Sequence, residues 1–237
     1  MILVDPDARP LVGHRGAAGT HAENTIPSFD AALGAGADAF ELDVHAAKDG
    51  VPVVIHDPTL DRTTDATGPV SAMTSDQLRG IDAGSGAYVP TLAEVLERYP
   101  TTPMIVELKE RAVTHAVLAL LRKLGAMDRV LLGAFEHAVL TPARTGEFHL
   151  SASRRETARV WVAARWAISL GGRFGGFTVP ERQGALRVVD SKFLRATVRS
   201  GKPVHVWTVD SVEDASRLRA MGVAGIITNF PGLLQNI

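Results

Sequence analysis

The sequence contains no cysteine, so neither disulfide bonds nor thiolate metal ligands are available to this chain. Charge of one sign is not in excess either, because 25 basic residues oppose 26 acidic ones and leave a formal net charge of -1. No broad cationic surface is therefore expected, and we predict no nucleic-acid partner. Any recognition of an anion such as phosphate must come from a few well-placed side chains.

Long apolar runs are also missing, so we expect no transmembrane segment. The first ten residues include Asp5 and Asp7 and lack the apolar stretch of a signal peptide. Together with the absence of cysteine, this favours a cytoplasmic protein. Hydrophobic residues make up 46% of the chain, which is enough for a large core. No linker or repeat divides the sequence, and residues 1–237 are expected to form one domain.

Short β-rich runs alternate with helical patterns, which favours an α/β fold with largely parallel strands. The expected strands are residues 11–14, 39–45, 51–56, 104–108, 130–135, 148–152, 174–179, 204–209 and 225–228. This pattern predicts a TIM (β/α)8 barrel with one extra strand, and an open doubly wound sheet is the alternative. Residues 57–90 are rich in Asp, Thr, Gly and Ser, and are expected to form a small insertion after the second barrel motif.

The segment between residues 41 and 57 is the most informative. Its Asp49-Gly50 pair is typical of a two-residue type I′ turn, which would fold the segment into a hairpin. With that turn, Asp43 is expected to lie opposite His56, and Glu41 shares the strand face of Asp43. A surface hairpin with ordinary polar residues is the alternative. The flanking strands are apolar, however, and carboxylates in such strands need a partner, for which a metal ion is a common choice.

Two further groups of polar residues follow predicted strands. Glu107 and Lys109 lie two residues apart at the end of an apolar run, and should share one face at the carboxyl end of a strand. Barrel enzymes place their chemistry at that end, although the pair alone could be only a salt bridge. His14, Arg15 and Gly16 end the first predicted strand in the same way.

Together these motifs resemble the glycerophosphodiester phosphodiesterase family. The resemblance extends in order from about residue 12 to 232 and is carried by HRG at 14–16, ENT at 23–25, ELDVHAAKDGVPVVIHDPTLDRTT at 41–64, PTLAEVL at 90–96, VELK at 106–109, VPERQGALRVV at 179–189, VHVWTVD at 204–210 and GVAGIITNFP at 222–231. It implies a TIM barrel that hydrolyses small glycerophosphodiesters to sn-glycerol 3-phosphate and an alcohol. The series of HRG, ENT, ELD, DG and HD at this spacing is highly specific.

The resemblance also implies roles for individual residues. One divalent cation, Mg2+ or Ca2+, is expected on Glu41, Asp43 and Glu107, since hard cations prefer oxygen ligands. The catalytic histidines are expected to be His14 and His56, one as base and one as acid. Positive charge for the phosphate would come from Arg15 and Lys109. A further substrate contact is Trp207, whose indole could stack on a glycerol moiety or could only fill the barrel interior.

Several alternatives remain open at this point. The nucleophile is either water or the glycerol 2-hydroxyl of the substrate, which would give a cyclic phosphate. A phospholipase D-like phosphodiesterase of the sphingomyelinase D type, which would release a stable cyclic phosphate, is disfavoured by the absence of cysteine and of a signal peptide. A non-catalytic barrel that only binds glycerophosphodiesters is disfavoured because both histidines and all three carboxylates are present.

The chain departs from the family pattern at several positions. Ala22 precedes ENT where proline is usual, and the segment after Ser85 lacks its usual aromatic residue, so that only Tyr88 remains nearby to line a head-group pocket. Asp210 stands where asparagine is common, and Asn229 where aspartate is common. We expect none of these residues to touch the acid–base or metal set. They are expected to affect substrate preference more than reaction type.

Overall fold

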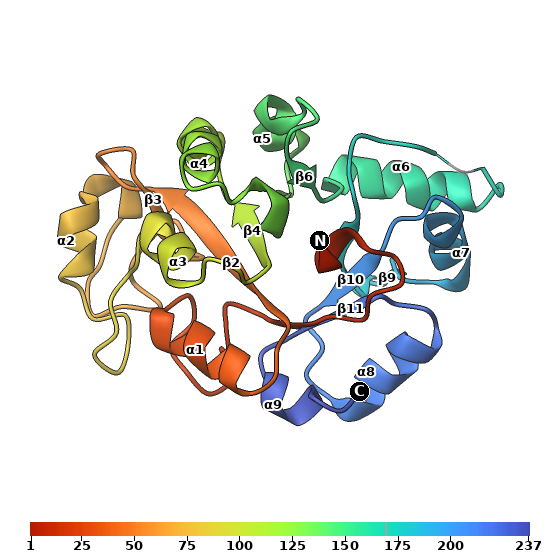
Figure 1. Cartoon of the computed structure of the whole chain (residues 1–237), viewed down its shortest axis with the longest axis horizontal. Helices are drawn as coiled ribbons and strands as arrows, with labels where there is room; N and C mark the ends of the chain where they lie inside the picture. Colours follow the sequence, from red (N-terminus) through yellow and green to blue (C-terminus); the bar gives the residue numbers. More distant parts are fainter. Residues whose placement is uncertain (169) are drawn as a thin grey trace.

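In the computed structural model, which describes residues 1–168 and 170–237, a curled sheet of parallel strands is surrounded by helices (Figure 1). The strands of this sheet are β1 (Leu11–Gly13), β2 (Ala39–Ala46), β4 (Met104–Leu108), β5 (Val130–Gly133), β6 (His149–Leu150), β7 (Phe177–Pro180), β10 (Val204–Trp207) and β11 (Gly225–Thr228). Each expected strand is present, and β4 and β11 have the predicted bounds.

The sheet closes into a barrel. Its strand order is β6-β5-β4-β2-β1-β11-β10-β7, and a parallel bridge between Ser151 and Gly176 joins the two end strands. Two backbone hydrogen bonds support this junction, from Gly175 N–H to the Leu150 carbonyl at 2.7 Å and from Ala152 N–H to the Gly176 carbonyl at 2.9 Å. The predicted TIM barrel is therefore confirmed, and the alternative of an open doubly wound sheet is wrong.

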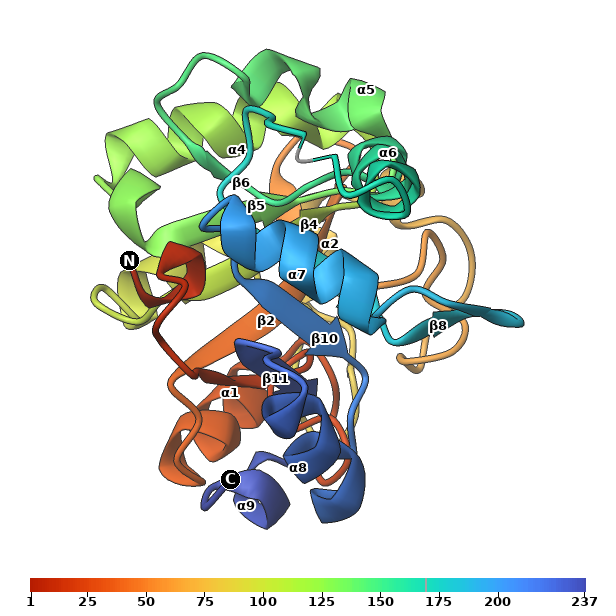
Figure 2. The same cartoon turned by 90° about the vertical axis from the view of Figure 1, so that its right-hand side faces the viewer.

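Helices cover the outside of the barrel (Figure 2). They are α1 (Ile26–Gly34), α3 (Leu92–Arg98), α4 (Arg111–Lys123), α5 (His137–Leu140), α6 (Arg154–Ala164), α7 (Ser191–Arg199), α8 (Val212–Ala220) and α9 (Pro231–Leu234). Their ends follow local capping rules: the Thr25 hydroxyl accepts the N–H of Ser28 at the start of α1, and Pro27 occupies the first turn. In α4, Val113, Val117 and Leu121 recur at helical spacing and are buried against the sheet.

The hairpin after β2 has a longer loop than the sequence predicts. The Gly50 N–H donates to the Ala47 carbonyl at 2.9 Å, and the Ala47 N–H donates to the Val51 carbonyl at 3.0 Å. Gly50 alone in this loop has a left-handed backbone, with a φ of 76°. Residues 48–50 therefore form a three-residue loop that ends in a left-handed glycine, and the predicted two-residue type I′ turn is wrong.

The extra loop residue shifts the hairpin register by one position. The antiparallel strand β3 (Pro52–Val54) pairs Val54 with Val44 of β2. Continuing this register, the Ile55 N–H donates to the Asp43 carbonyl at 3.0 Å. Asp43 thus faces Ile55 and not His56, which corrects the predicted pairing. The one extra strand that the sequence predicts is β3, which pairs with β2 and lies off the barrel path.

The segment after β3 forms the expected insertion. It contains the short helices η2 (Val70–Ala72) and α2 (Ser75–Arg79), and a bridge from Val53 to Thr91 returns the chain to the barrel. A small core of its own joins it to the hairpin, made of Ala47, Val53, Ile55, Leu60, Val70, Leu78, Ile81, Ala83 and Val89. The insertion therefore packs against β3, beside the end of β2.

A 3-10 helix at the N-terminus, η1 (Ile2–Val4), closes one end of the barrel (Figure 1). Its Leu3 is fully buried against interior residues of the strands, namely Val12, Ala39, Ile105, Leu131 and Ile227. The Leu3 carbonyl lies 2.8 Å from Nε2 of His205, which is fully buried in the barrel interior. Burial lowers the pKa of His205 from 6.5 to about 4. No helix in the described ranges could span a bilayer.

Candidate active site

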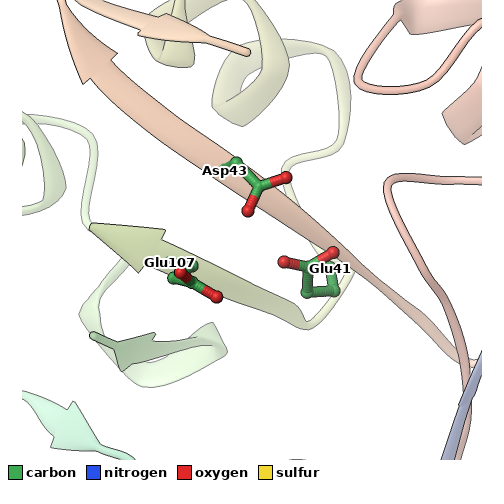
Figure 3. Close-up of side chains that lie close together, drawn as sticks. All are labelled: Glu41, Asp43 and Glu107. Atoms are coloured by element: carbon green, nitrogen blue, oxygen red, sulfur yellow. The ribbon is translucent and has the colours of Figure 1, made fainter. Parts of the chain in front are cut away.

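Three carboxylates meet at the end of the barrel away from η1. Glu41 and Asp43 share one face of β2, and Glu107 is the register partner of Asp43 on the neighbouring strand β4. Figure 3 shows their side chains pointing toward a common space, and one oxygen atom of each lies within 4.8 Å of those of the others. Parallel pairing of two buried strands therefore brings together the residues that the sequence singled out as metal ligands.

The negative charge of this cluster is only partly compensated by the protein. Burial raises the pKa of Glu41 well above its ordinary value, and the nearby Asp43 and Glu107 raise it further. The pKa of Glu107 is raised as well, by burial and by Asp43, although Lys109 opposes the shift. A hard divalent cation would remove this repulsion, and three oxygen donors at this spacing suit such an ion. The donor set therefore fits the predicted metal.

Lys109 supplies part of the missing positive charge. Its Nζ lies 2.8 Å from Oδ1 of Asp43 and 2.7 Å from Oε1 of Glu107, and its side chain is only 12% exposed. Burial raises the pKa of Asp43, but the charges of Lys109 and Arg15 outweigh it and hold that pKa below its ordinary value. Lys109 thus contacts two of the three carboxylates directly.

Arg15 is held in a fixed position between the carboxylates. Its backbone N–H donates to Oε2 of Glu41 at 3.0 Å, and its Nε lies 3.3 Å from Oδ2 of Asp43. Its backbone is left-handed, with a φ of 52°, and its carbonyl accepts the Ser28 hydroxyl at 3.0 Å. A second guanidinium nitrogen donates to Glu23 at 2.9 Å. The Arg15 side chain is therefore held by contacts with two acidic side chains, Asp43 and Glu23.

His14 is positioned by a polar chain from β11. Its Nδ1 lies 2.8 Å from Oδ1 of Asn229, whose Nδ2 donates to Oδ2 of Asp210 at 2.7 Å. Because the Asn229 oxygen is an acceptor, Nδ1 carries the proton and Nε2 is left with a lone pair, 4.0 Å from Oε2 of Glu41. Two of the departures from the family pattern thus lie directly behind His14, and the expectation that none would touch the acid–base set is wrong.

His56 has a partner of a different kind. Its Nδ1 lies 2.5 Å from Oδ1 of the adjacent Asp57, and Arg62 donates from Nε to Oδ2 of Asp57 at 2.6 Å. The bond to Arg62 is the main cause that holds the pKa of Asp57 far below its ordinary value. Behind the ring, Nε2 of His45 lies 3.1 Å from the His56 carbonyl, which gives His45 a structural role. Asp57 and His45 together fix the orientation of His56.

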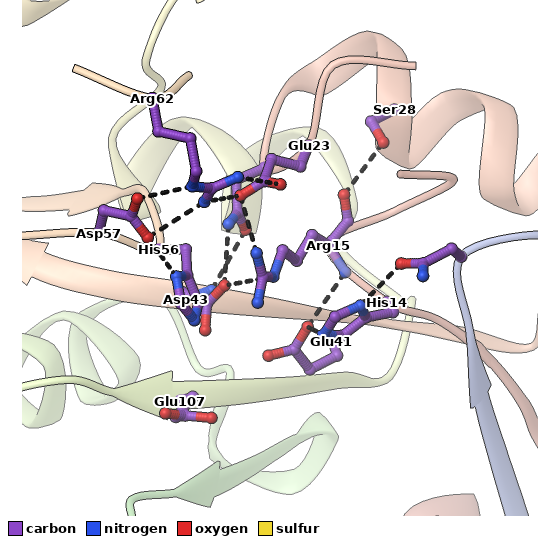
Figure 4. Close-up of polar contacts among 12 residues, drawn as sticks. His14, Arg15, Glu23, Ser28, Glu41, Asp43, His56, Asp57, Arg62 and Glu107 are labelled. Atoms are coloured by element: carbon purple, nitrogen blue, oxygen red, sulfur yellow. Dashed lines mark hydrogen bonds and ion pairs between the residues drawn. The ribbon is translucent and has the colours of Figure 1, made fainter. Parts of the chain in front are cut away.

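Ion pairs connect the surroundings of His56 to Arg15 (Figure 4). Arg62 donates to both oxygens of Glu23, at 2.7 and 2.9 Å, and Glu23 in turn accepts from Arg15. Sequence reasoning assigned no role to Glu23, Asp57 or Arg62, although all three fall inside the family motifs. Their role depends on contacts between the insertion and the barrel, which no sequence spacing reveals.

A single cavity of about 440 Å³ collects the residues predicted from the sequence. Its lining includes His14, Arg15, Glu41, Asp43, His56, Glu107, Lys109 and Trp207. Among the described residues that line the cavity, Tyr88 is not included, so the expectation that it lines a head-group pocket here is wrong. Its ring lies under the guanidinium of Arg79, which is 4.9 Å from the ring centre. Apolar residues that the sequence did not single out form another wall of the cavity, among them Phe135, Trp161 and Leu186.

Comparison with known proteins agrees with this geometry. A glycerophosphodiester phosphodiesterase of Caldanaerobacter subterraneus subsp. tengcongensis is 29% identical over 96% of this chain and 96% of its own length. The crystal structure of a glycerophosphodiester phosphodiesterase from Agrobacterium tumefaciens str. C58 has a TM-score of 0.78, with 30% identity over 97% of this chain and 100% of that one.

A phosphodiesterase from Oleispira antarctica, solved in complex with the product sn-glycerol-3-phosphate, shares the fold with a TM-score of 0.79. Its identity is 24%, and 96% of each chain is covered. The sequence model of the glycerophosphoryl diester phosphodiesterase family matches residues 14–233, which is nearly the whole chain. The chain therefore belongs to the glycerophosphoryl diester phosphodiesterase family, whose members are phosphoric diester hydrolases.

Proposed function

We propose that this protein hydrolyses glycerophosphodiesters to sn-glycerol 3-phosphate and an alcohol, with His14 and His56 as its acid–base pair. One observation carries the proposal: each histidine uses Nδ1 for a protein partner and lines the same cavity as the three carboxylates. Nε2 of each ring is thereby available for proton transfer to or from a bound phosphodiester.

The carboxylates of Glu41, Asp43 and Glu107 would hold one Mg2+ or Ca2+ ion. When bound, that ion neutralises the cluster and polarises a phosphoryl oxygen. Arg15 and Lys109 lie against the same carboxylates and would offer donors to the remaining phosphate oxygens. Positively charged groups beside the non-bridging phosphate oxygens reduce the repulsion between those oxygens and the attacking oxygen, which otherwise protects a phosphodiester from attack.

The two histidines divide the proton transfers. One ring takes the proton of the attacking hydroxyl group, and the other protonates the oxygen of the departing alcohol. The attacking group is water or the 2-hydroxyl of the substrate's glycerol, and the second route passes through a cyclic phosphate that water opens. Trp207, which meets Phe135 edge to face at 5.8 Å, would pack against the glycerol moiety.

The test is a panel of metals and substrates. Glycerophosphocholine, -ethanolamine, -glycerol and -inositol are incubated with Mg2+ or Ca2+, or after EDTA treatment, and glycerol 3-phosphate is measured with a coupled assay.

The two histidines are tested by substitution. The His14→Ala and His56→Ala proteins should each lose most of kcat, while His115→Ala, a change at an exposed helix position, should keep it. Full activity after exhaustive chelation would contradict the metal assignment. A stable cyclic phosphate as end product would favour the phospholipase D-like reaction, and binding without turnover would favour a binding barrel.

A further inference from the structure

Basic residues are unevenly distributed along the chain, although its total charge is close to zero. Residues 149–202 contain 11 of the 25 basic residues and only 3 of the 26 acidic ones. The balance of the whole chain, from which we expected no broad cationic surface, hides this local excess. A separation of charge of this kind is typical of a protein whose basic side meets an anionic partner.

The outer face of α6 presents basic and apolar side chains together. Arg155, Arg159, Val162 and Trp166 recur at helical spacing, the last of them in the turn that follows the helix, and all four are exposed. Trp166 is 78% exposed, Val162 55% and the nearby Ile168 52%. These five residues are called the α6 surface below. Val162 also lines the cavity that contains the carboxylates, so the α6 surface borders that cavity.

A hairpin next to α6 carries the same two kinds of side chain. It consists of the short strands β8 (Arg182–Gln183) and β9 (Leu186–Arg187), and it projects from the barrel in Figure 2. Leu186 is 46% exposed, and both arginines are exposed as well. The indole N–H of Trp161 donates to the Arg187 carbonyl at 3.3 Å, which joins the helix to the hairpin.

Most arginines of these two segments are available to an anionic partner. Arg155, Arg159 and Arg182 form no ion pair with any residue that the structure describes. Arg165 differs, because it is paired with Asp190. Exposed guanidinium groups without an acidic neighbour keep their full charge, and their planar donors suit phosphate oxygens.

The apolar side chains between the arginines indicate which kind of anion fits. Val162, Ile168 and Leu186 are aliphatic and cannot stack on a nucleic acid base, so a nucleic acid would leave them exposed. An anionic bilayer offers phosphate groups to the arginines and acyl carbons to the aliphatic side chains. Trp166 has the amphipathic ring that is typical of the boundary between lipid and water.

We propose that the α6 surface and the β8–β9 hairpin dock this protein on membranes that contain anionic lipids. The guanidinium groups lie among the lipid phosphates, and the apolar side chains reach the outermost acyl carbons. The attachment is peripheral and is weakened by salt, which screens exposed charges. Because Val162 belongs both to the α6 surface and to the cavity lining, the docked molecule holds its cavity beside the bilayer.

The experiment is co-sedimentation of the whole chain with vesicles of phosphatidylcholine, either alone or with about one-third phosphatidylglycerol. A basic residue near an anionic surface contributes roughly fivefold to partitioning, so three unpaired arginines should raise the partition coefficient on the anionic vesicles at least about a hundredfold. The Arg155→Gln/Arg159→Gln variant should lose roughly thirtyfold of that partitioning. Quenching of tryptophan fluorescence by brominated lipid should disappear in Trp166→Phe.

The matched control is Arg111→Gln/Lys123→Gln. It removes the same charge from exposed positions at the two ends of α4, outside the docking surface, and should partition like the wild type. Thermal unfolding shows whether each variant is folded. Hydrolysis of glycerophosphoglycerol in solution should be equal in the wild type and in Arg155→Gln/Arg159→Gln, because neither arginine is among the described residues that line the cavity.

The outcomes separate this proposal from the proposed function. No sedimentation with the anionic vesicles would overturn the docking surface. Equal losses in the α6 variant and the control would also overturn it, since only net charge would then matter. Tighter binding to a DNA oligonucleotide than to the vesicles would assign the surface to nucleic acid instead. A chain that binds the vesicles as expected but turns over no glycerophosphodiester would contradict the proposed function and leave the docking surface standing.

Discussion

Replacing Lys109 by methionine tests the charge balance of the carboxylate cluster most directly. Methionine keeps an unbranched side chain but removes the ammonium group that lies 2.8 Å from Asp43 and 2.7 Å from Glu107. Removing one partner of a buried ion pair typically costs about 3–5 kcal/mol, because the remaining charge stays buried without compensation. For a chain of this size, such a loss corresponds to a decrease in Tm of roughly 10 °C.

The assay is thermal unfolding of both proteins at pH 8, first in EDTA and then in Mg2+ or Ca2+. In EDTA the Lys109→Met protein should melt well below the wild type. An added divalent cation that binds only the folded state should recover much of the difference. The difference should also shrink as the pH falls, because protonation of the carboxylates removes the repulsion that Lys109 otherwise offsets.

Lys123→Met provides the matched control, since Lys123 is exposed in the last turn of α4 and should change Tm very little. The reasoning is refuted if Lys109→Met in EDTA stays within about 1 kcal/mol of the wild type. It is also refuted if metal stabilises the wild type and leaves the deficit of the variant unchanged.

Three further predictions concern other side chains. Because burial lowers the pKa of His205 from 6.5 to about 4, the unfolded chain binds a proton that the folded chain does not bind between these pH values. Stability should therefore fall as the pH drops from about 6.5 to about 4, by up to about 3 kcal/mol more than in His205→Gln, as measured by urea unfolding. Asn229→Ala should lower kcat about tenfold with little change in KM, because His14 loses the partner that fixes its tautomer; an unchanged kcat would exclude this role. Arg62→Gln should lower kcat by a similar factor by releasing Asp57 and Glu23, and parallel losses of kcat and Tm would instead indicate a structural role.

Local sequence was enough to predict the barrel, because its strands are short apolar runs bounded by turn residues. The β4 strand, residues 104–108, is a clear case: every residue except the penultimate Glu107 is apolar. The strand period grouped Glu41 with Asp43, whereas Glu107 joined them through barrel geometry and the family resemblance. Hairpin register could not be predicted, because an Asp-Gly pair is compatible with both a two-residue and a three-residue loop, and one residue shifts every pair.

Contacts between distant segments account for what sequence reasoning missed. Asn229 is 215 residues away from His14, and only closure of the barrel, with β11 beside β1, brings them together. Asp210 and Asn229 were noticed as unusual, yet their position behind His14 depends on that closure. The pairing of Arg62 with Glu23 likewise depends on how the insertion folds back over the barrel.

The N-terminal helix η1, which closes one end of the barrel, determines how the protein can be attached to a support. Leu3 and His205 meet at the end of the barrel opposite the carboxylates, and Met1 is partly exposed there. A tether joined to Met1 would hold the molecule with its cavity directed away from a support. Removing residues 1–4 would instead delete η1 and leave Nε2 of His205 without the Leu3 carbonyl. A tag for immobilisation should therefore be added before Met1, with residues 1–4 retained.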